Sequence, residues 1–555
     1  MPLHSTLPPD DQRRVFLRPP PELGARKVVL ATNIAETAIT VDDVGFVIDT
    51  GRMKETRYDP SRRMESLDEV QVSRANAKQR RGRAGRVRPG VAIHLFTRHA
   101  HEVTMAGHQV PEVCRVPLDR LVLTIKALRY PQPAADVCAR LIEPPSAEAV
   151  RRAIAELVEI DALQLSEPQP AAGARAGAPP AAVEELTALG EHLAKLPVDV
   201  RIGKLLLFGA IFDVADEALT VAATLSFRTP FLAPFDKRAE ADAAKMRFKA
   251  GQSDHLTVLR AYREFDQSGG ARFQMARECF LSVRTLQSIA QLKRQLLELL
   301  SDARFVRPGL RARAVEAVGR RERGSDGCRT AIMLGVDAAL DGGADGAAAG
   351  GALATPDDLD GSTGELLKSL LCAALYPQVV VVEESKKAGK MPKLLTREEG
   401  SAEPMPVQIH PSSVNAREAH FASTYLVYAE KVKTGAVFVR DCAPVSPYAL
   451  LMFAGELRSE GGVRVSGRAK GGRRRQVEQR DAAGGEVVLC IDQWIRFRVP
   501  QRVESLILDL REQLEALLKT KISRPELELS SAGRGVLSAV MSLIAGQHGP
   551  GLGGF

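Results

Sequence analysis

The stretch AKQRRGRAGRVRPG, Ala77–Gly90, sets arginines between glycines and holds no acidic residue. An arginine suits phosphate because its planar donors match two phosphate oxygens and its charge persists at every relevant pH. If a helix begins upstream, Gln79, Arg83 and Arg86 follow i, i+4, i+7 spacing and share one face. The glycines would allow a close backbone approach. The pattern predicts a phosphate site, and the run alone leaves a solvated basic face open as the alternative.

Short apolar runs surround this stretch. They have the length and composition of buried strands, and they occupy residues 27–32, 44–50 and 91–96. The segment around 73–84 is helix-like. Because buried strands alternate here with helical sequence, the first hundred residues predict a parallel α/β fold.

Beyond about residue 112 the pattern becomes helical. Apolar residues within 146–160 recur at i, i+3, i+4, i+7 and i+8, and a second long helical pattern covers 280–300. After about 370, short β-type runs return without helical crossovers, which predicts a small barrel or sandwich. Residues 503–522 predict an amphipathic helix, and the Gly-rich sequence after it predicts a disordered tail.

Three segments have compositions that do not support a packed core. Residues 167–183 and 340–364 are rich in Ala, Gly and Pro, with little bulky apolar surface to offset chain entropy. Residues 461–476 carry six positive charges and no acidic residue. We expect all three to be mobile loops or insertions.

Composition narrows the class of protein. The balance of 76 basic against 68 acidic side chains gives a net charge of +8, which favours polyanionic partners. The seven cysteines form no C-x-x-C pair, which argues against a zinc module and for reduced thiols inside a cell. The N-terminus lacks the apolar core of a signal peptide, and no run of about 18 apolar residues occurs. We therefore expect no metal site and no membrane partner.

Four segments near the N-terminus follow one another closely: MPLHSTLP (1–8), VVLATNIAETAITVDD (28–43), VIDTGRMKETRYD (47–59) and QRRGRAGR (79–86). They resemble motifs IV, V, Va and VI of the second RecA-like lobe of the DEAH-box RNA helicases. The resemblance continues through LGEHLAKLPVDVRIGKLLLFGAIF (189–212), SDHLTVLRAY (253–262), LCAALYPQVV (371–380), IHPSSVN (409–415) and EKVKTGAVFVRDC (430–442). It covers nearly the whole chain outside the low-complexity segments and looks most like the multidomain cytoplasmic branch.

The resemblance implies a multidomain chain with α/β, α and β parts. The implied domains are a partial RecA-like α/β lobe (1–110), a winged helix (111–196), a helical ratchet bundle (197–366), an OB-fold barrel (367–502), and a C-terminal helix with a flexible tail (503–555). In this layout 340–364 is a loop of the ratchet domain, and 461–476 is a basic insertion in the OB-fold.

Motif VI carries the catalytic assignment. In such helicases its glutamine and two arginines contact the γ-phosphate side of ATP. The resemblance places Gln79, Arg83 and Arg86 there, with both arginines as fingers. Arg80 and Arg81 are expected on other faces of the same helix, where substitution should matter far less.

Three further residues are assigned to the nucleotide by resemblance. Thr40 and Asp42 close motif V and would lie near the ribose, and Phe16 matches the phenylalanine that stacks on adenine. The alternative for Phe16, a place in the hydrophobic core, stays open.

The resemblance also assigns contacts to RNA. Thr32 and Asn33 would contact RNA phosphates through a hydroxyl, an amide and nearby backbone N–H groups. The other phosphate-side candidates are His4 and Ser5 of motif IV, and Arg52 and Lys54 of motif Va. The alternative for these four is an ordinary polar surface, with more weight for Lys54.

An OB-fold binds single strands along a basic, partly aromatic face. The run YLVYAEKVKT supplies Tyr425, Tyr428, Lys433 and Thr434 within ten residues, and Arg440 lies on the next strand. We assign these five to RNA. For one of the two tyrosines, packing inside the barrel is an equal alternative.

Two strings that ATP hydrolysis needs do not occur in the sequence. One is the Walker A loop, G-x-x-x-x-G-K-[ST], and the other is D-E-A-H, which holds Mg²⁺. ATP with Mg²⁺ is therefore expected only with a missing first lobe, and we interpret the chain as N-terminally truncated. Two hypotheses for the function remain: the chain is the C-terminal part of an RNA helicase, or it is a non-catalytic RNA-binding or partner-docking module. A third hypothesis, a DNA-binding regulator, is weaker because motifs V and VI would then have no function.

The expected partners follow from the same resemblance. They are mainly single-stranded RNA, and a protein activator that docks on the winged-helix and OB domains. We expect a cytoplasmic protein, with the nucleus as the alternative compartment.

Overall fold

The computed structural model places most of the 555 residues in two compact units. It describes residues 1–3, 12–18, 26–37, 41–59, 64–166, 183–227, 229–322, 324–341, 358–383, 391–397, 403–433, 436–460 and 486–546. Unit 1 comprises Met1–Pro117, Leu141–Ser146 and Val432–Gly435, and unit 2 comprises Leu118–Arg140, Ala147–Lys431 and Ala436–Phe555. His4, Ser5, Thr40 and Thr434 lie outside the described residues, as do 167–182, 342–357 and 461–476.

Unit 1 contains parallel strand pairs. β1 (Pro2–Leu3) pairs with β2 (Leu30–Ala31), and β3 (Phe46–Asp49) pairs with β6 (Val91–His94) in the register Ile48↔Ile93. Parallel strands need a long crossover between them. The crossover from β3 to β6 includes helix α3, so the predicted α/β character is confirmed. The prediction that these strands are buried is wrong, because Leu30, Phe46 and Ile48 are 72%, 74% and 66% exposed.

A long β-hairpin that the sequence patterns did not predict follows β3 directly. It consists of β4 (Arg52–Asp59) and β5 (Met64–Gln71), which pair antiparallel from Arg52↔Gln71 to Asp59↔Met64. The turn into β4 passes through Gly51, whose φ of +71° favours glycine. The backbone N–H of Gly51 donates to Asp49 Oδ1 at 2.9 Å, which fixes this turn.

Helix α3 (Arg74–Arg81) carries the first part of the arginine-rich stretch. Ser73 caps its N-terminus by accepting from the backbone N–H of Asn76 at 3.1 Å. Ala77 faces a small core with Met53, Val72 and Met105. The helix ends at Arg81 because Gly82 forms its C-cap.

Unit 2 begins with three helices followed by a hairpin. They are α4 (Asp119–Ala127), α5 (Ala134–Ala139), α6 (Ala147–Glu159), and the antiparallel strands β7 (Leu163–Ser166) and β8 (Val183–Leu186). The buried Lys126 Nζ lies 2.8 Å from Glu184 Oε2, which ties α4 to β8. The helical pattern predicted within 146–160 is confirmed as α6.

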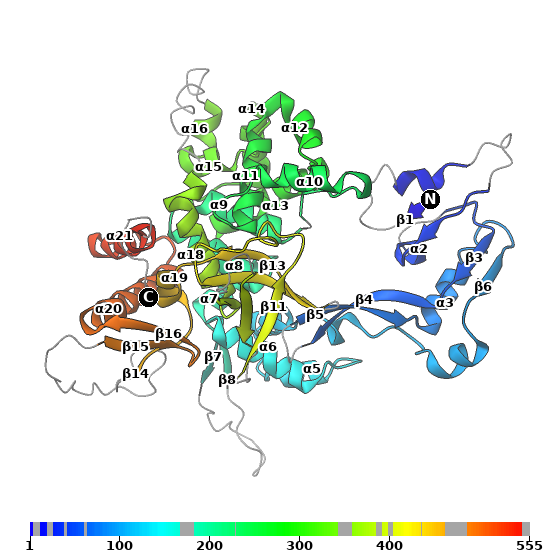
Figure 1. The fold of residues 1–555 in the computed structure, drawn as a ribbon, viewed down its shortest axis with the longest axis horizontal. Coiled ribbons are helices and arrows are strands. Elements are labelled where there is room, and N and C mark those ends of the chain that lie inside the picture. The colour runs from blue at the N-terminus through cyan, green and yellow to red at the C-terminus, as the bar shows by residue number, and fades with distance from the viewer. Residues whose placement is uncertain are drawn as a thin grey trace, which may run out of the picture. The chain divides into compact units, whose positions relative to one another are not determined.

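A helical region follows (Figure 1, green). Its helices are α7 (Ala188–Lys195), α8 (Val200–Ile211), α9 (Ala215–Leu225), α10 (Arg238–Met246), α11 (Asp254–Gln267), α12 (Arg272–Glu278), α13 (Val283–Asp302), α14 (Ala312–Arg321), α15 (Cys328–Leu334) and α16 (Val336–Asp341). One core cluster gathers Phe248, Tyr262, Leu286 and Ile289 from this region. The pattern predicted over 280–300 is α13, and it buries one side against α9 and α14.

A charged group sits inside this helical region. Lys293, only 2% exposed, lies 2.7 Å from Asp216 Oδ1 and 2.8 Å from Asp326 Oδ2. Tyr262 Oη donates to Asp326 at 2.9 Å. Burial and the Asp326 carboxylate raise the pKa of Asp266 to about 8, which leaves that carboxyl neutral near pH 7. Lys293 is therefore the main counter-charge of two buried carboxylates.

The β-rich part of unit 2 follows α18 (Ser362–Leu375), most of which is buried. Its strands are β9 (Val379–Glu383), β10 (Lys393–Arg397), β11 (Pro404–Ile409), β12 (Tyr425–Lys433) and β13 (Val437–Pro444). They lie in the order β13-β11-β10-β9-β12, and β13 also pairs with β12 (Figure 1, yellow). This pairing closes a five-stranded barrel, so the predicted barrel is confirmed.

The later strands do not extend the barrel as predicted. After α19 (Pro447–Phe453), strands β14 (Leu457–Glu460), β15 (Glu486–Ile491) and β16 (Ile495–Pro500) form a three-stranded sheet of their own. Apolar strand patterns reveal strands but not their partners, which is why sequence alone grouped them with the barrel.

The C-terminus contains two helices. α20 (Gln501–Ser523) confirms the predicted amphipathic helix, and its buried Arg511 donates to the backbone carbonyls of Leu451 and Gly455. The expectation of a disordered tail is wrong for α21 (Ser531–Ala545). The physical reason is its spaced apolar residues, since Leu537, Val540 and Ile544 are buried at helical spacing. Among the described residues, no helix has the length and apolar content to span a membrane.

Lys293→Met should destabilise the protein by about 3–5 kcal/mol, because it leaves two buried carboxylates without their counter-charge. Lys293 and hydrogen bonds hold the pKa of Asp326 low although burial raises it. Without Lys293 the pKa of Asp326 in the folded protein rises. A carboxyl group whose pKa is higher in the folded than in the unfolded protein lowers the free energy of unfolding as the pH rises and the group must ionise. The deficit, measured by urea unfolding, should thus be larger at pH 7 than at pH 5.

Lys519→Met is the matched control, because Lys519 is exposed on α20. Equal unfolding midpoints for the Lys293 and Lys519 variants would contradict the role given to the buried lysine.

Candidate functional site

The arginines of the opening stretch do not share one helical face as predicted. α3 ends at Arg81, so only Gln79 of the predicted trio lies on the helix, where it is exposed. Arg83 lies in the turn after the helix, and Arg86 lies in the bend that follows. After Gly82 the backbone turns with i→i−3 hydrogen bonds, from the Arg83 N–H to the Arg80 carbonyl at 3.1 Å and from the Ala84 N–H to the Arg81 carbonyl at 3.2 Å, so the α-helical repeat does not reach either arginine.

Arg83 has the environment of an anion-binding side chain. Its Nε and Nη1 atoms are shielded from solvent and have no hydrogen-bond partner among the described residues. Burial and then the neighbouring positive charge of Arg86 lower its pKa, and Glu36 opposes this shift. Buried donors without acceptors are costly, and two like charges repel. A bound anion would relieve both costs.

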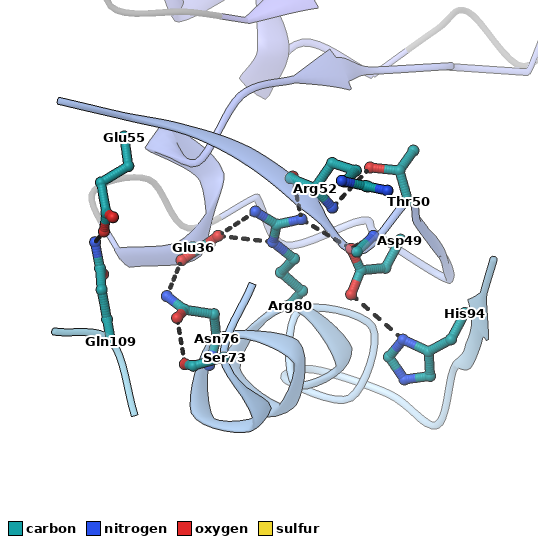
Figure 2. Close-up of polar contacts among 11 residues, drawn as sticks. Glu36, Asp49, Thr50, Arg52, Glu55, Ser73, Asn76, Arg80, His94 and Gln109 are labelled. Atoms are coloured by element: carbon teal, nitrogen blue, oxygen red, sulfur yellow. Dashed lines mark hydrogen bonds and ion pairs between the residues drawn. The ribbon is translucent and has the colours of Figure 1, made fainter. Parts of the chain in front are cut away.

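Arg80 lies on another face of α3 than Gln79, and its side chain is engaged inside unit 1. Its Nε donates to Glu36 Oε1 at 2.6 Å, and its Nη1 donates to Asp49 Oδ1 at 2.8 Å. Nη1 also lies 3.1 Å from the backbone carbonyl of Arg52. Arg80 points inward between motifs V and Va, so it belongs to the framework of unit 1 and not to a solvated face (Figure 2).

Two carboxylates complete this framework. Glu36 Oε2 accepts from Asn76 Nδ2 at 2.8 Å, so one carboxylate holds two side chains of α3. Asp49 faces Arg80 with Oδ1, and its Oδ2 lies 3.3 Å from His94 Nδ1 on β6. We call Glu36, Asp49 and Arg80 the clamp (Figure 2).

Sequence reasoning missed Glu36 and Asp49. They lie 44 and 31 residues before Arg80 along the chain, and no local pattern links such distant positions. The available signal was their place in the segments that resemble motifs V and Va.

The structure decides one alternative for Phe16. Within η1 (Arg14–Phe16), Val15 is buried, whereas Phe16 is 51% exposed. Phe16 is thus no core residue of the described part of unit 1, and its stacking on adenine stays a prediction. Lys27 holds this turn in place, because its Nζ lies 2.8 Å from the Val15 carbonyl and 2.6 Å from Asp43. Asp42 is exposed.

Thr32 and Asn33 are exposed and lead into α2 (Ile34–Thr37). The Thr32 N–H donates to the Leu3 carbonyl at 3.1 Å, and the Asn33 carbonyl accepts from the Glu36 N–H at 2.9 Å. Their side chains are exposed, while their backbones are fixed. Arg52 and Lys54 are also exposed, at the start of β4.

The two barrel tyrosines differ in environment. Tyr428 is 4% exposed within the barrel core, and its hydroxyl lies 3.5 Å from Thr396 Oγ1. The prediction that Tyr428 contacts RNA is wrong, because a ring inside the barrel cannot stack on a base. Tyr425 is half-buried, with its ring 5.7 Å from that of Phe497. Burial raises the pKa of Tyr425.

The basic candidates on the barrel also differ. Lys433 is exposed at the end of β12. Arg440 Nη1 lies 3.3 Å from Glu430 Oε2, and its Nη2 lies 3.2 Å from His410 Nε2. Arg440 is therefore partly neutralised, whereas Lys433 presents its charge to solvent. Within the described ranges, no three His, Cys, Asp or Glu side chains gather as metal ligands would.

Comparison with protein families matches four parts of the chain. Residues 1–88 match the helicase conserved C-terminal domain, and 199–258 match the ratchet-like helicase associated domain. Residues 367–457 match an oligonucleotide/oligosaccharide-binding fold, and 487–546 match the C-terminal domain in RNA helicases.

Individual relatives align with nearly the whole chain. "Putative ATP-dependent RNA helicase DHX57" of Homo sapiens is 42% identical over 98% of this chain and 36% of its own length. ATP-dependent DNA/RNA helicase DHX36 of Bos taurus is 36% identical over 99% of this chain and 46% of its own length. ATP-dependent RNA helicase dhx29 of Xenopus laevis is 35% identical over 95% of this chain. The chain thus spans between a third and a half of the length of these relatives.

Proposed function

Because the chain belongs to the DEAH-box RNA helicase family, we propose that it supplies the second RecA-like lobe and the RNA-binding domains of an ATP-dependent RNA helicase. In this function ATP hydrolysis drives the unwinding or remodelling of RNA. The observation that carries the proposal is Arg83, whose shielded donors find no acceptor among the residues that the structure describes and which lies beside a second arginine.

The arginine turn fits the terminal phosphates of ATP. Arg83 offers two unsatisfied donors, and Arg86 adds a second positive charge close by. As the bond to the leaving group breaks, negative charge develops on the leaving oxygen and is spread over the γ-phosphoryl oxygens, and fixed arginines stabilise that charge. Gln79, exposed on α3, would orient the attacking water. The described residues of this chain offer no ligand cluster for Mg²⁺, so we assign it no step here.

The remaining nucleotide contacts are assigned by family resemblance and fit their exposure. Phe16 presents half its surface to solvent, as a ring that stacks on adenine requires. Asp42 is exposed and would meet the ribose with Thr40. ATP is thus the substrate that we propose for this lobe when a first lobe completes the site.

RNA would meet the chain on two surfaces. In unit 1, the exposed Thr32, Asn33 and Arg52 would contact phosphates, with Lys54 and the motif IV residues beside them. In unit 2, Tyr425 and Arg440 would form a stacking and charged face of the barrel. These contacts carry no base-specific hydrogen bonding, so we propose binding of single strands without strong sequence preference.

The order of the elements in unit 2 supports two further domain assignments. The order α4, α5, α6, β7, β8 supports a winged helix within 111–196, and α8 to α16 support a ratchet domain. A protein activator would dock on the winged-helix and OB domains, and the cytoplasm is the proposed compartment.

A second candidate is a non-catalytic RNA-binding or partner-docking module. The observation that favours it is the absence of the Walker A and D-E-A-H strings from the 555 residues. The chain would then keep its RNA-binding domains without driving ATP hydrolysis. ATPase measurements on the chain with and without a complementing first lobe separate the two functions.

The purified 555-residue chain alone should release no phosphate from ATP, with or without RNA, because it has no loop to cradle the phosphates. Phosphate release is compared with a mock preparation. RNA-stimulated turnover above that background would show that the chain holds a complete ATP site.

The chain should bind a single-stranded RNA oligonucleotide, and log K should fall with log salt by about 0.7 per phosphate contact. Tyr425→Ala should weaken binding by about 1–3 kcal/mol if the ring stacks on a base. Tyr428→Phe is the matched control, because that ring lies in the barrel core and should leave affinity unchanged. Equal losses for both variants, or affinity flat with salt, would refute this RNA surface.

With a first lobe restored by fusion or in trans, Arg83→Ala or Arg86→Ala should lower kcat by about 10³-fold or more. Arg83→Lys should not restore full activity, because an ammonium cannot reproduce the planar fork. Arg81→Ala is the control, since Arg81 is exposed at the end of α3. The measurement is RNA-stimulated ATP turnover. Similar losses of kcat in the Arg81 and Arg83 variants would show that the arginines act only as a general basic patch and would contradict the finger assignment.

A further inference from the structure

We propose that the clamp of Glu36, Asp49 and Arg80 is the element that couples RNA contact in unit 1 to the position of Arg83 and Arg86. This inference rests on the proposed function. It makes Arg80 a positioning residue, which acts on ATP through the arginines that follow it and touches neither ligand itself.

The clamp joins the two proposed ligand sites by short covalent paths. On the RNA side, Glu36 lies three residues after Asn33, and its N–H donates to the Asn33 carbonyl at 2.9 Å. On the ATP side, Arg80 lies three residues before Arg83, across the end of α3. A displacement of 32–36 on RNA binding therefore reaches the arginine turn through one ion pair.

The side-chain geometry gives the clamp two arms. One arm is the Glu36 carboxylate, which accepts from Arg80 Nε at 2.6 Å and from Asn76 Nδ2 at 2.8 Å. Asn76 and Arg80 are one helical turn apart, so this carboxylate follows the orientation of α3. The other arm is Arg80 Nη1, which contacts Asp49 and the Arg52 carbonyl at the start of β4.

The clamp residues are largely buried, which restricts the positions that their charged groups can take. Glu36 and Asp49 are 6% and 3% exposed, and the Arg80 side chain is 15% exposed. Burial alone would lower the pKa of Arg80, but the hydrogen bonds that Arg80 donates to Asp49 and Glu36 raise it above its ordinary value. One guanidinium faces two carboxylates, so the clamp itself carries excess negative charge. The negative charge of Glu36 also acts on Arg83, because it opposes the lowering of the Arg83 pKa.

Other interactions hold the lobe without the clamp. The β3–β6 ladder runs over four residue pairs, and Ser73 caps α3 independently of Arg80. Loosening the clamp should thus leave the lobe folded but let α3 and the arginine turn move apart from motif V. A clamp that positions the arginine turn can therefore be lost without unfolding the lobe, whereas a purely structural clamp cannot.

The test uses hydrogen exchange on the 555-residue chain with and without a short oligouridylate. In the parent chain, RNA should slow amide exchange within 79–88 by about fivefold or more, the lower end of usual coupling between two sites. Arg80→Lys keeps the charge but loses the fork, and Glu36→Gln keeps the shape but loses the charge. Both variants should bind the RNA with the parent Kd, yet show no slowing within 79–88. Arg81→Lys, at an exposed position, should respond like the parent.

The outcomes separate this inference from the proposed function. If the parent chain does not bind the RNA, the proposed function and this inference both fail. If RNA binds but exchange within 79–88 does not slow in the parent, or still slows in both variants, only the coupling is overturned. If both variants lose exchange protection in β3 and β6, the clamp is merely structural, and the inference is overturned.

Discussion

The buried ion pair between Arg80 and the carboxylates of Glu36 and Asp49 is the constraint on which the arrangement of unit 1 depends. A buried charge is tolerated only when it is paired and hydrogen-bonded, so each partner restricts the position of the others. The three residues come from α2, β3 and α3, which carry the segments that resemble motifs V, Va and VI. The two ion pairs of Arg80 therefore link α2 and β3 to the helix that leads into the arginine turn.

That constraint explains why neighbouring arginines differ in character. Arg80 is satisfied inside the lobe, Arg81 is exposed at the end of the helix, and Arg83 has shielded donors that meet no acceptor in the described part of the chain. The run is basic throughout, but only part of the charge is available for a ligand. The aligned relatives are RNA helicases, and the environment of Arg83 is the basis of the proposal that it faces a nucleotide.

The sequence predicted the parts of the fold that depend on local periodicity. The α/β start, α6, α13, the barrel strands and α20 were all visible as apolar patterns. Sequence patterns did not predict contacts between residues far apart in the chain, or the residue at which a helix ends. The C-cap at Gly82 breaks the predicted face, and the clamp joins positions 44 and 31 residues apart. Alternation along β12 could not place Tyr428 inside the barrel, because which side faces the core depends on closure by β13.

The central claim is that Arg83 and Arg86 face the terminal phosphate of ATP. The most direct measurement is a structure of the chain bound to a complementing first lobe, ADP–aluminium fluoride and single-stranded RNA. We predict that guanidinium nitrogens of both arginines lie within about 3 Å of the fluoride ligands, with Arg80 still paired to Glu36. Arginines turned toward RNA phosphates or protein carboxylates, with the fluoride contacted by neither, would contradict it.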